Sequence, residues 1–330
     1  MPDEALHQAH DKLFKAGFSD PINAAAFLRG EIPAAITARI DWEQLQLQPG
    51  SFVDSHYRHS ESDLLFAAPF AGKECLIYIL FEHQTAEDSK LALRLLRYMV
   101  RIWEAQLKNH PAPAKLPIIL PIVLAQNAEV WKLPPQFSAL LDIPRDLQNE
   151  LGAFVPDFTF QLIQLASLPF DSIRGTPAGI MTLRVMKAER IAKLLDDMVW
   201  DEALMMQLSR ETLELLIRYM LRADIDKVAF DSKVRSITQG ELKTTTMTLA
   251  DQLREEGQEK GLEKGLEKGL KKGLEKGFQE SILEALEIRF GQIPDGLGEI
   301  VVGIHDPSRL RSLHKAAIKA ATLEAFTAAL

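Results

Sequence analysis

The chain has 330 residues, a formal net charge of -8 and 47% hydrophobic residues. This composition is typical of a packed globular protein and excludes a largely disordered chain. The longest apolar run, Leu116 to Ala125, is too short to span a bilayer, and the single cysteine, Cys75, excludes an internal disulfide. Acidic residues at the start, in place of a basic segment followed by an apolar one, predict a cytoplasmic protein without a signal peptide.

The N-terminal part of the sequence predicts two short helices. The first covers His10 to Lys15 and the second covers Ile22 to Leu28. Asp20 suits the N-cap of the second helix. Pro21 suits its first position, because proline has no backbone N–H and the helix offers no acceptor for one there. We expect these helices to cover a sheet.

Three segments then predict strands. Polar and apolar residues alternate from Trp42 to Val53, as in a half-buried strand, although Pro49-Gly50 interrupts the pattern with a turn signal. Strands are predicted from Ser62 to Pro69 and from Glu74 to Glu82. The turn residues Ala71-Gly72-Lys73 separate these last two strands, which predicts an antiparallel hairpin.

A helix and two more strands complete the predicted sheet. The helix runs from about Glu87 to Leu107, with Leu91, Leu95, Tyr98 and Ile102 on one apolar face. The strand from Leu116 to Leu124 follows this crossover helix, so it is predicted to run parallel to its predecessor. A last strand is predicted from Thr159 to Leu165. The fold class is therefore a mixed α/β sheet flanked by helices.

The C-terminal half is predicted to be helical. Helices are expected from Gly179 to Met198 and from Glu202 to Leu221, either packed on the sheet or forming a small helical subdomain. We therefore divide the chain into a first domain of residues 1–175, a helical region of residues 176–249, and a repeat helix with a helical tail in residues 250–330.

Glycine recurs every four residues in the third region, mostly followed by Leu-Glu-Lys. The repeat comprises Gly257, Gly261, Gly265, Gly269, Gly273 and Gly277. A period of four is close to the helical 3.6, so glycines and leucines form adjacent stripes on a helix. Six glycines, at about 1 kcal/mol each, make a poor isolated helix. Two interpretations stay open: a solvated, fraying helix, or a helix that contacts a second copy or docks on the body of the protein.

Two carboxylates are the candidates for chemistry. The predicted hairpin brings Asp63 opposite Glu82, and residues two apart in a strand share a face, so Gln84 projects with Glu82 while His83 points away. Carboxylate oxygens that converge at a sheet edge suit Mg²⁺ or Mn²⁺. A metal there would activate water for phosphodiester hydrolysis. The alternative is that Asp63 is an ordinary solvent-exposed carboxylate without a catalytic role.

A basic helix face offers a candidate surface for a phosphate backbone. Lys90, Arg94, Arg97 and Arg101 recur at spacings of three or four residues and so lie along one side of a helix. The overall negative charge argues mildly against nucleic acid, but a local basic face can coexist with an acidic total. The alternative interpretation is an ordinary solvated helix face.

Several of these segments together resemble a known family. In chain order they are His10-Asp11-x-x-Phe14-Lys15, Gly50-Ser51-Phe52-Val53, Ser62-Asp63-Leu64-Leu65-Phe66, Ile79-Leu80-Phe81-Glu82-His83-Gln84 and Arg94-Leu95-Leu96-Arg97-Tyr98-Met99. This ordered set, with the Gly-x-Glu-Lys tail, is similar to the recombination-promoting nuclease family, whose members are also described as transposases. The resemblance implies a PD-(D/E)XK restriction-endonuclease-like fold. It also implies a Mg²⁺-dependent DNA endonuclease linked to recombination or mobile elements, with Asp63 and Glu82 as metal ligands and Gln84 as a further catalytic residue.

The sequence departs from the family pattern at two places. Gln84 stands where the standard motif has lysine, so positive charge would come from the metal or from Lys90 or Arg94. Leu124 to Asn127 stands where relatives often have a Tyr-His-Gly-like sequence. Both departures support the alternative function, a non-catalytic DNA-binding or oligomerising module derived from a nuclease fold.

Two further expectations concern an extra acid and the assembly. Asp11 is either an additional acid of the site or a carboxylate that compensates the positive N-terminal end of a helix. A homodimer is expected because cutting both DNA strands with one type of site normally requires two sites related by symmetry.

Overall fold

The computed structural model of the chain describes residues 2–49, 64–109, 115–223 and 225–330. For residues 2–8, 73–80, 82, 109 and 295 it describes the backbone alone. The chain divides into two compact units, Met1–Ala250 and Asp251–Leu330. Within the described ranges, no helix combines the length and the apolar character needed to cross a lipid bilayer.

A five-stranded mixed sheet forms the centre of the first unit. Its strands, in spatial order, are β1 (Gln46–Leu47), β2 (Leu64–Phe70), β3 (Lys73–Gln84), β4 (Ile118–Ala125) and β5 (Gln161–Gln164). The first three strands pair antiparallel, whereas β3, β4 and β5 pair parallel. The predicted hairpin and the parallel crossover are both confirmed.

The ends of the hairpin strands show where the prediction was and was not precise. Ala71 and Gly72 have φ values of 58° and 65°, the left-handed conformation that a two-residue hairpin turn requires. The strand expected from Trp42 to Val53 is described only as the short β1, because Trp42 starts a 3-10 turn capped by Asp41. From residue 50 to residue 63 the prediction lies outside the described residues.

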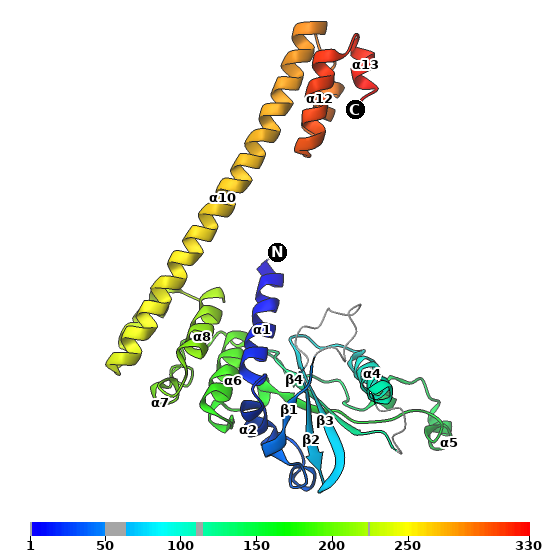
Figure 1. The fold of residues 1–330 in the computed structure, drawn as a ribbon, viewed down its shortest axis with the longest axis vertical. Helices are drawn as coiled ribbons and strands as arrows, with labels where there is room; N and C mark the ends of the chain where they lie inside the picture. Colours follow the sequence, from blue (N-terminus) through cyan, green and yellow to red (C-terminus); the bar gives the residue numbers. More distant parts are fainter. Residues whose placement is uncertain (1, 50–63, 110–114, 224) are drawn as a thin grey trace. The chain divides into compact units, whose positions relative to one another are not determined.

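Helices cover both faces of the sheet (Figure 1). On one face lie α1 (Pro2–Phe18) and α2 (Pro21–Glu31), and on the other lies α4 (Leu91–Asn109). The predicted apolar face of α4 is confirmed, since its side chains are buried with those of β2 and β4. This core contains Leu65, Ala67, Leu91, Leu95, Tyr98, Ile102, Ile119 and Val123.

Four phenylalanines fill the core under α1 and α2. Phe14, Phe18 and Phe27 each lie within 6.1 Å, between ring centroids, of Phe81 on β3. The helices are longer than predicted, but the predicted cap is confirmed, because the Asp20 carboxylate accepts a hydrogen bond from the backbone of Ile22 at 2.9 Å. This cap sets the turn that places Phe18 and Phe27 on the same core.

The helices after residue 176 are α6 (Pro177–Arg190), α7 (Glu202–Met205), α8 (Arg210–Arg222) and α9 (Lys227–Ser236). The helix predicted to reach Met198 ends at Arg190. The helix predicted from Glu202 to Leu221 is interrupted, because Ser209 caps a new helix through a bond from Thr212. Both α6 and α8 contact α1. The predicted domain boundary after residue 175 stays a prediction.

The second unit is helical. The long helix α10 (Gly240–Phe290) continues into it from the first unit, and α11 (Asp295–Val302), α12 (Pro307–Lys319) and α13 (Leu323–Thr327) follow. Ile282, Leu286, Val301, Leu310 and Phe326 form its core. The glycine repeat is continuous helix, and for all six glycines of the repeat a Cβ would meet no atom within 4 Å in the described part of the chain.

Candidate functional site

The end of β3 carries the predicted chemistry. Glu82 pairs with Val123 and Gln84 with Ala125, while Leu64 pairs with Phe81. Asp63 directly precedes Leu64 in the chain, and Glu82 directly follows Phe81. The two predicted ligands are therefore sequence neighbours of the same cross-strand pair. Asp63 itself lies outside the described residues, and Glu82 is described by its backbone alone.

No metal site is evident in the part of the chain that the structure describes. Among those residues, no group of three His, Cys, Asp or Glu side chains is arranged to hold an ion. Asp63 lies outside that part and Glu82 is described by its backbone alone, so this absence does not concern the pair. Metal binding by Asp63 and Glu82 stays a prediction.

The basic residues near this edge differ in how far their charge is compensated. Lys90 and Arg97 are exposed, at the start and in the second turn of α4. Arg94 Nη1 forms an ion pair with Asp88 Oδ2 at 2.6 Å. Lys90 and Arg97 are therefore the better placed of the three predicted residues to meet a phosphate backbone, and DNA binding by the three stays a prediction.

Behind the end of β3, His83 is buried on the face that α1 covers. Its ring stacks on Phe14, with centroids 5.1 Å apart and planes at 18°. Its Nδ1 lies 3.3 Å from Asp11 Oδ1, and both side chains are at most 8% exposed. Asp11 is in the second half of α1, so compensation of charge at the helix N-terminus does not explain it. In the structure its carboxylate contacts His83.

Gln126 determines the role of one ring nitrogen of His83. The Nε2 of Gln126 donates to the backbone oxygen of Met186 at 2.8 Å, which can only accept. The other amide atom, Oε1, therefore faces His83 Nε2 at 2.7 Å, and His83 must donate there.

A second buried histidine continues the network. Arg190 Nη2 lies 3.0 Å from His10 Nε2, and because arginine can only donate, this nitrogen of His10 accepts. The proton of His10 then lies on Nδ1, which is 2.6 Å from the Tyr219 hydroxyl and 3.3 Å from Gln126 Nε2. Only the hydroxyl can accept this proton, because the amide nitrogen is itself a donor. Gln126 Nε2 also donates to this hydroxyl, at 3.2 Å. Burial, followed by the charge of Glu189, raises the pKa of Tyr219.

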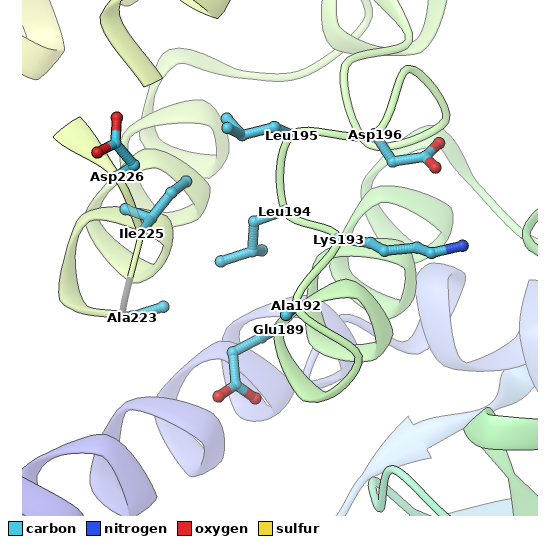
Figure 2. Close-up of a pocket in the computed structure, with 9 residues that line it drawn as sticks. All are labelled: Glu189, Ala192, Lys193, Leu194, Leu195, Asp196, Ala223, Ile225 and Asp226. Carbon is cyan, nitrogen blue, oxygen red and sulfur yellow. The ribbon is translucent and has the colours of Figure 1, made fainter. Parts of the chain in front are cut away.

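The outer end of this network reaches a pocket of about 460 Å³. Glu189 Oε2 and Arg190 Nε lie 3.3 Å apart as an ion pair, yet neither buried atom has a hydrogen-bond partner among the described residues. Burial raises the pKa of Glu189, and the charge of Arg190 opposes that rise. Figure 2 shows the Glu189 carboxylate toward α1, with Leu194 and Ile225 on opposite walls.

Sequence reasoning singled out Asp11 but missed most of its buried neighbours. The alternation along β3 already indicated that His83 faces away from Glu82 and Gln84. For Gln126 and Tyr219 no local signal existed, because their importance comes from contacts between elements that are distant in the chain.

Comparisons with known proteins give a consistent family. The recombination-promoting nuclease RpnA of Escherichia coli K12 is 28% identical over 257 residues, covering 75% of this chain and 84% of the relative. Nuclease RpnD of Escherichia coli O157:H7 is 32% identical over 127 residues, covering 38% of this chain and 48% of the relative. The inactive nuclease-like protein RpnE of Escherichia coli K12 is 26% identical over 275 residues, covering 78% and 85%.

No solved structure matches the chain significantly, so the comparisons leave the PD-(D/E)XK fold as a prediction. The family model described as "Putative transposase, YhgA-like" matches residues 8–215. That range includes the whole sheet, α4, α6 and α1 from residue 8 onward, and with them most of the buried network. The chain therefore belongs to the YhgA-like transposase family, which includes relatives named recombination-promoting nucleases.

Proposed function

We propose that the protein is a metal-dependent DNA endonuclease that acts in recombination or on mobile elements. The observation that carries the proposal is the strand arrangement, an antiparallel hairpin followed by a parallel strand, with Glu82 and Gln84 at the end of β3. The register pairs Leu64 with Phe81, which supports a position for Asp63 close to Glu82. The names of the relatives support the nuclease activity.

In this proposal each residue has a separate task. Asp63 and Glu82 hold Mg²⁺ or Mn²⁺, and the bound ion supplies an activated water and stabilises the leaving oxygen. Gln84 orients the water or the scissile phosphate through its neutral amide. Lys90 and Arg97 contact the DNA backbone, and Lys90 provides the positive charge that Gln84 lacks.

The alternative function is a non-catalytic module that binds DNA or associates with itself. Two observations favour it. Gln84 replaces the charged residue of the standard motif, and the relative RpnE, which matches over 78% of this chain, is named inactive. The two functions differ in one measurable property, which is turnover of a phosphodiester bond.

The test is cleavage of supercoiled plasmid by the full chain in Mg²⁺, Mn²⁺, Ca²⁺ or EDTA. We expect cleavage in Mg²⁺ or Mn²⁺ that disappears in the Asp63→Ala and Glu82→Ala variants. Asp142→Ala, which removes an exposed acid elsewhere in the first unit, is the matched control and should cleave normally. A folded wild type that cleaves in no metal but retains DNA would establish the alternative function.

The same assay reports on assembly. A homodimer with two sites produces linear plasmid directly, whereas a single site first accumulates nicked circles. We expect the ratio of linear to nicked product to rise with protein concentration. A single-stranded RNA of matched length, added as a competing substrate, decides whether DNA is preferred.

A further inference from the structure

We propose that His83 is a positioning residue of this nuclease site, held by Asp11 and Gln126 so that the end of β3 from Glu82 to Gln84 keeps a fixed backbone. The proposal rests on the proposed function, because it concerns the same site. It assigns a task to a buried side chain that lies between two predicted catalytic residues in the chain.

The contacts of His83 come from separate elements. Phe14 and Asp11 belong to α1, and Gln126 directly follows β4. The backbone N–H of Gln126 also donates to the carbonyl oxygen of Gln84 at 2.7 Å. The end of β3 is therefore held through a side chain on the α1 face and through a backbone bond one residue further along.

Because His83 and Gln126 are buried, these hydrogen bonds are costly to lose. His83 is 2% exposed and Gln126 is fully buried, so a ring nitrogen that loses its partner finds no water to replace it. A hydrogen bond inside the protein is also stronger than one in water, which favours a single ring position. Because neighbouring residues of a strand share its backbone, a fixed His83 restricts the residues on both sides of it.

Two pairs of variants separate positioning from catalysis. Asn in place of Asp11 keeps the shape and can still bond with His83 Nδ1, whereas Leu cannot. We therefore expect Asp11→Asn to cleave within a few-fold of wild type. Asp11→Leu should lower kcat by about tenfold or more with little change in KM, because a displacement of catalytic groups slows the chemical step more than it weakens substrate binding. Gln126→Leu should behave like Asp11→Leu.

Tyr219→Phe is the matched control. It removes a hydroxyl from the same network but leaves Gln126 bonded to Met186 and to His83. We expect normal cleavage per folded molecule. The second readout is hydrogen exchange of the backbone amides from Glu82 to Thr85, measured without metal or DNA. This exchange should become faster in Asp11→Leu and Gln126→Leu, and stay unchanged in Asp11→Asn.

Each other result has a definite meaning. If Asp11→Asn abolishes cleavage while amide exchange is unchanged, Asp11 is a catalytic acid and the positioning proposal is wrong. If Tyr219→Phe loses as much cleavage as Asp11→Leu, the effect is general destabilisation and the proposal is again wrong. If the wild type does not cleave, the proposed function fails. Unchanged exchange of the backbone amides from Glu82 to Thr85 in Asp11→Leu would then also refute the proposal that Asp11 and His83 fix the end of β3.

Discussion

The amide nitrogen of Gln126 lies 2.8 Å from the carbonyl oxygen of Met186, and this contact determines the role of one ring nitrogen of His83. It fixes which end of the amide faces His83, so Nε2 of that ring must carry a proton. Arg190 gives the equivalent constraint for His10, whose proton lies on Nδ1.

The first prediction concerns these two tautomers. In protein with ¹⁵N-labelled histidine, we expect His10 as the neutral form protonated on Nδ1, and His83 with a persistent proton on Nε2. Long-range ¹H–¹⁵N spectra distinguish the forms, and His10→Gln and His83→Gln assign the signals. A proton on Nε2 of His10 would contradict the contact with Arg190.

The second prediction concerns Tyr219. Its hydroxyl accepts the proton of His10 Nδ1 in a site where both side chains are buried. Tyr219→Phe leaves that buried donor without an acceptor, so the free energy of unfolding should fall by about 1–3 kcal/mol. Urea unfolding at neutral pH measures the loss. Unchanged stability would mean that another group, or water, replaces the hydroxyl.

The third prediction tests the packing of α1 on the sheet. Phe14 is fully buried against Phe18, Phe81 and His83, so Phe14→Ala should cost about 3–5 kcal/mol. Phe154 is 85% exposed, and Phe154→Ala should change stability by less than about 0.5 kcal/mol. Similar losses in both variants would contradict the described core.

Local patterns were sufficient to predict the hairpin and the parallel strand, but not the bounds of β1. The turn at Ala71 and Gly72, the alternation in β3 and the helical spacing of Leu91 and Leu95 each depend on residues close in the chain. For that reason the hairpin and the parallel strand were predicted with nearly correct bounds, whereas α4 begins at Leu91 rather than at about Glu87. Helix ends were less accurate, because caps such as Ser209 depend on one side-chain bond.

The buried network could not be predicted in this way. His10 and Tyr219 are 209 positions apart in the chain, and only the packing of α8 on α1 brings them together. Gln126 lies in the segment that departs from the family pattern, and the structure gives its amide a defined partner at each end. Single-sequence patterns contain no information on such pairings, which depend on how distant helices return to the sheet.

The fourth prediction concerns the pH dependence of stability. Burial raises the pKa of Glu189 above its ordinary value of 4.5, so the folded protein binds this proton more tightly than the unfolded chain does. The stability that the protonated Glu189 carboxyl contributes is fully present below pH 4.5 and is lost as the pH rises through the raised pKa.

Glu189→Gln removes this titration. The free energy of unfolding of wild type, relative to that of the variant, should therefore decrease as pH rises from about 4 to about 7. Urea unfolding of both proteins at each pH measures this difference. An increase with pH would mean that the ion pair with Arg190 outweighs burial and lowers the pKa instead.

The fifth prediction concerns the glycine repeat of α10. A Cβ at Gly265 or Gly269 would meet no atom of the described chain within 4 Å, and the neighbouring Leu266 and Leu270 are 70% and 65% exposed. Each glycine therefore lowers helix stability without a packing benefit, by up to about 1 kcal/mol relative to alanine. Gly265→Ala and Gly269→Ala should raise the helical circular dichroism signal and its thermal midpoint, and the double variant should show the sum.

Gly291 has a φ of 80° at the end of α10, so Gly291→Ala is the contrasting control and should lower the midpoint. A lower midpoint for the repeat variants would show that these glycines lie against a close partner, since only a steric contact at the added methyl group reverses the sign of the substitution.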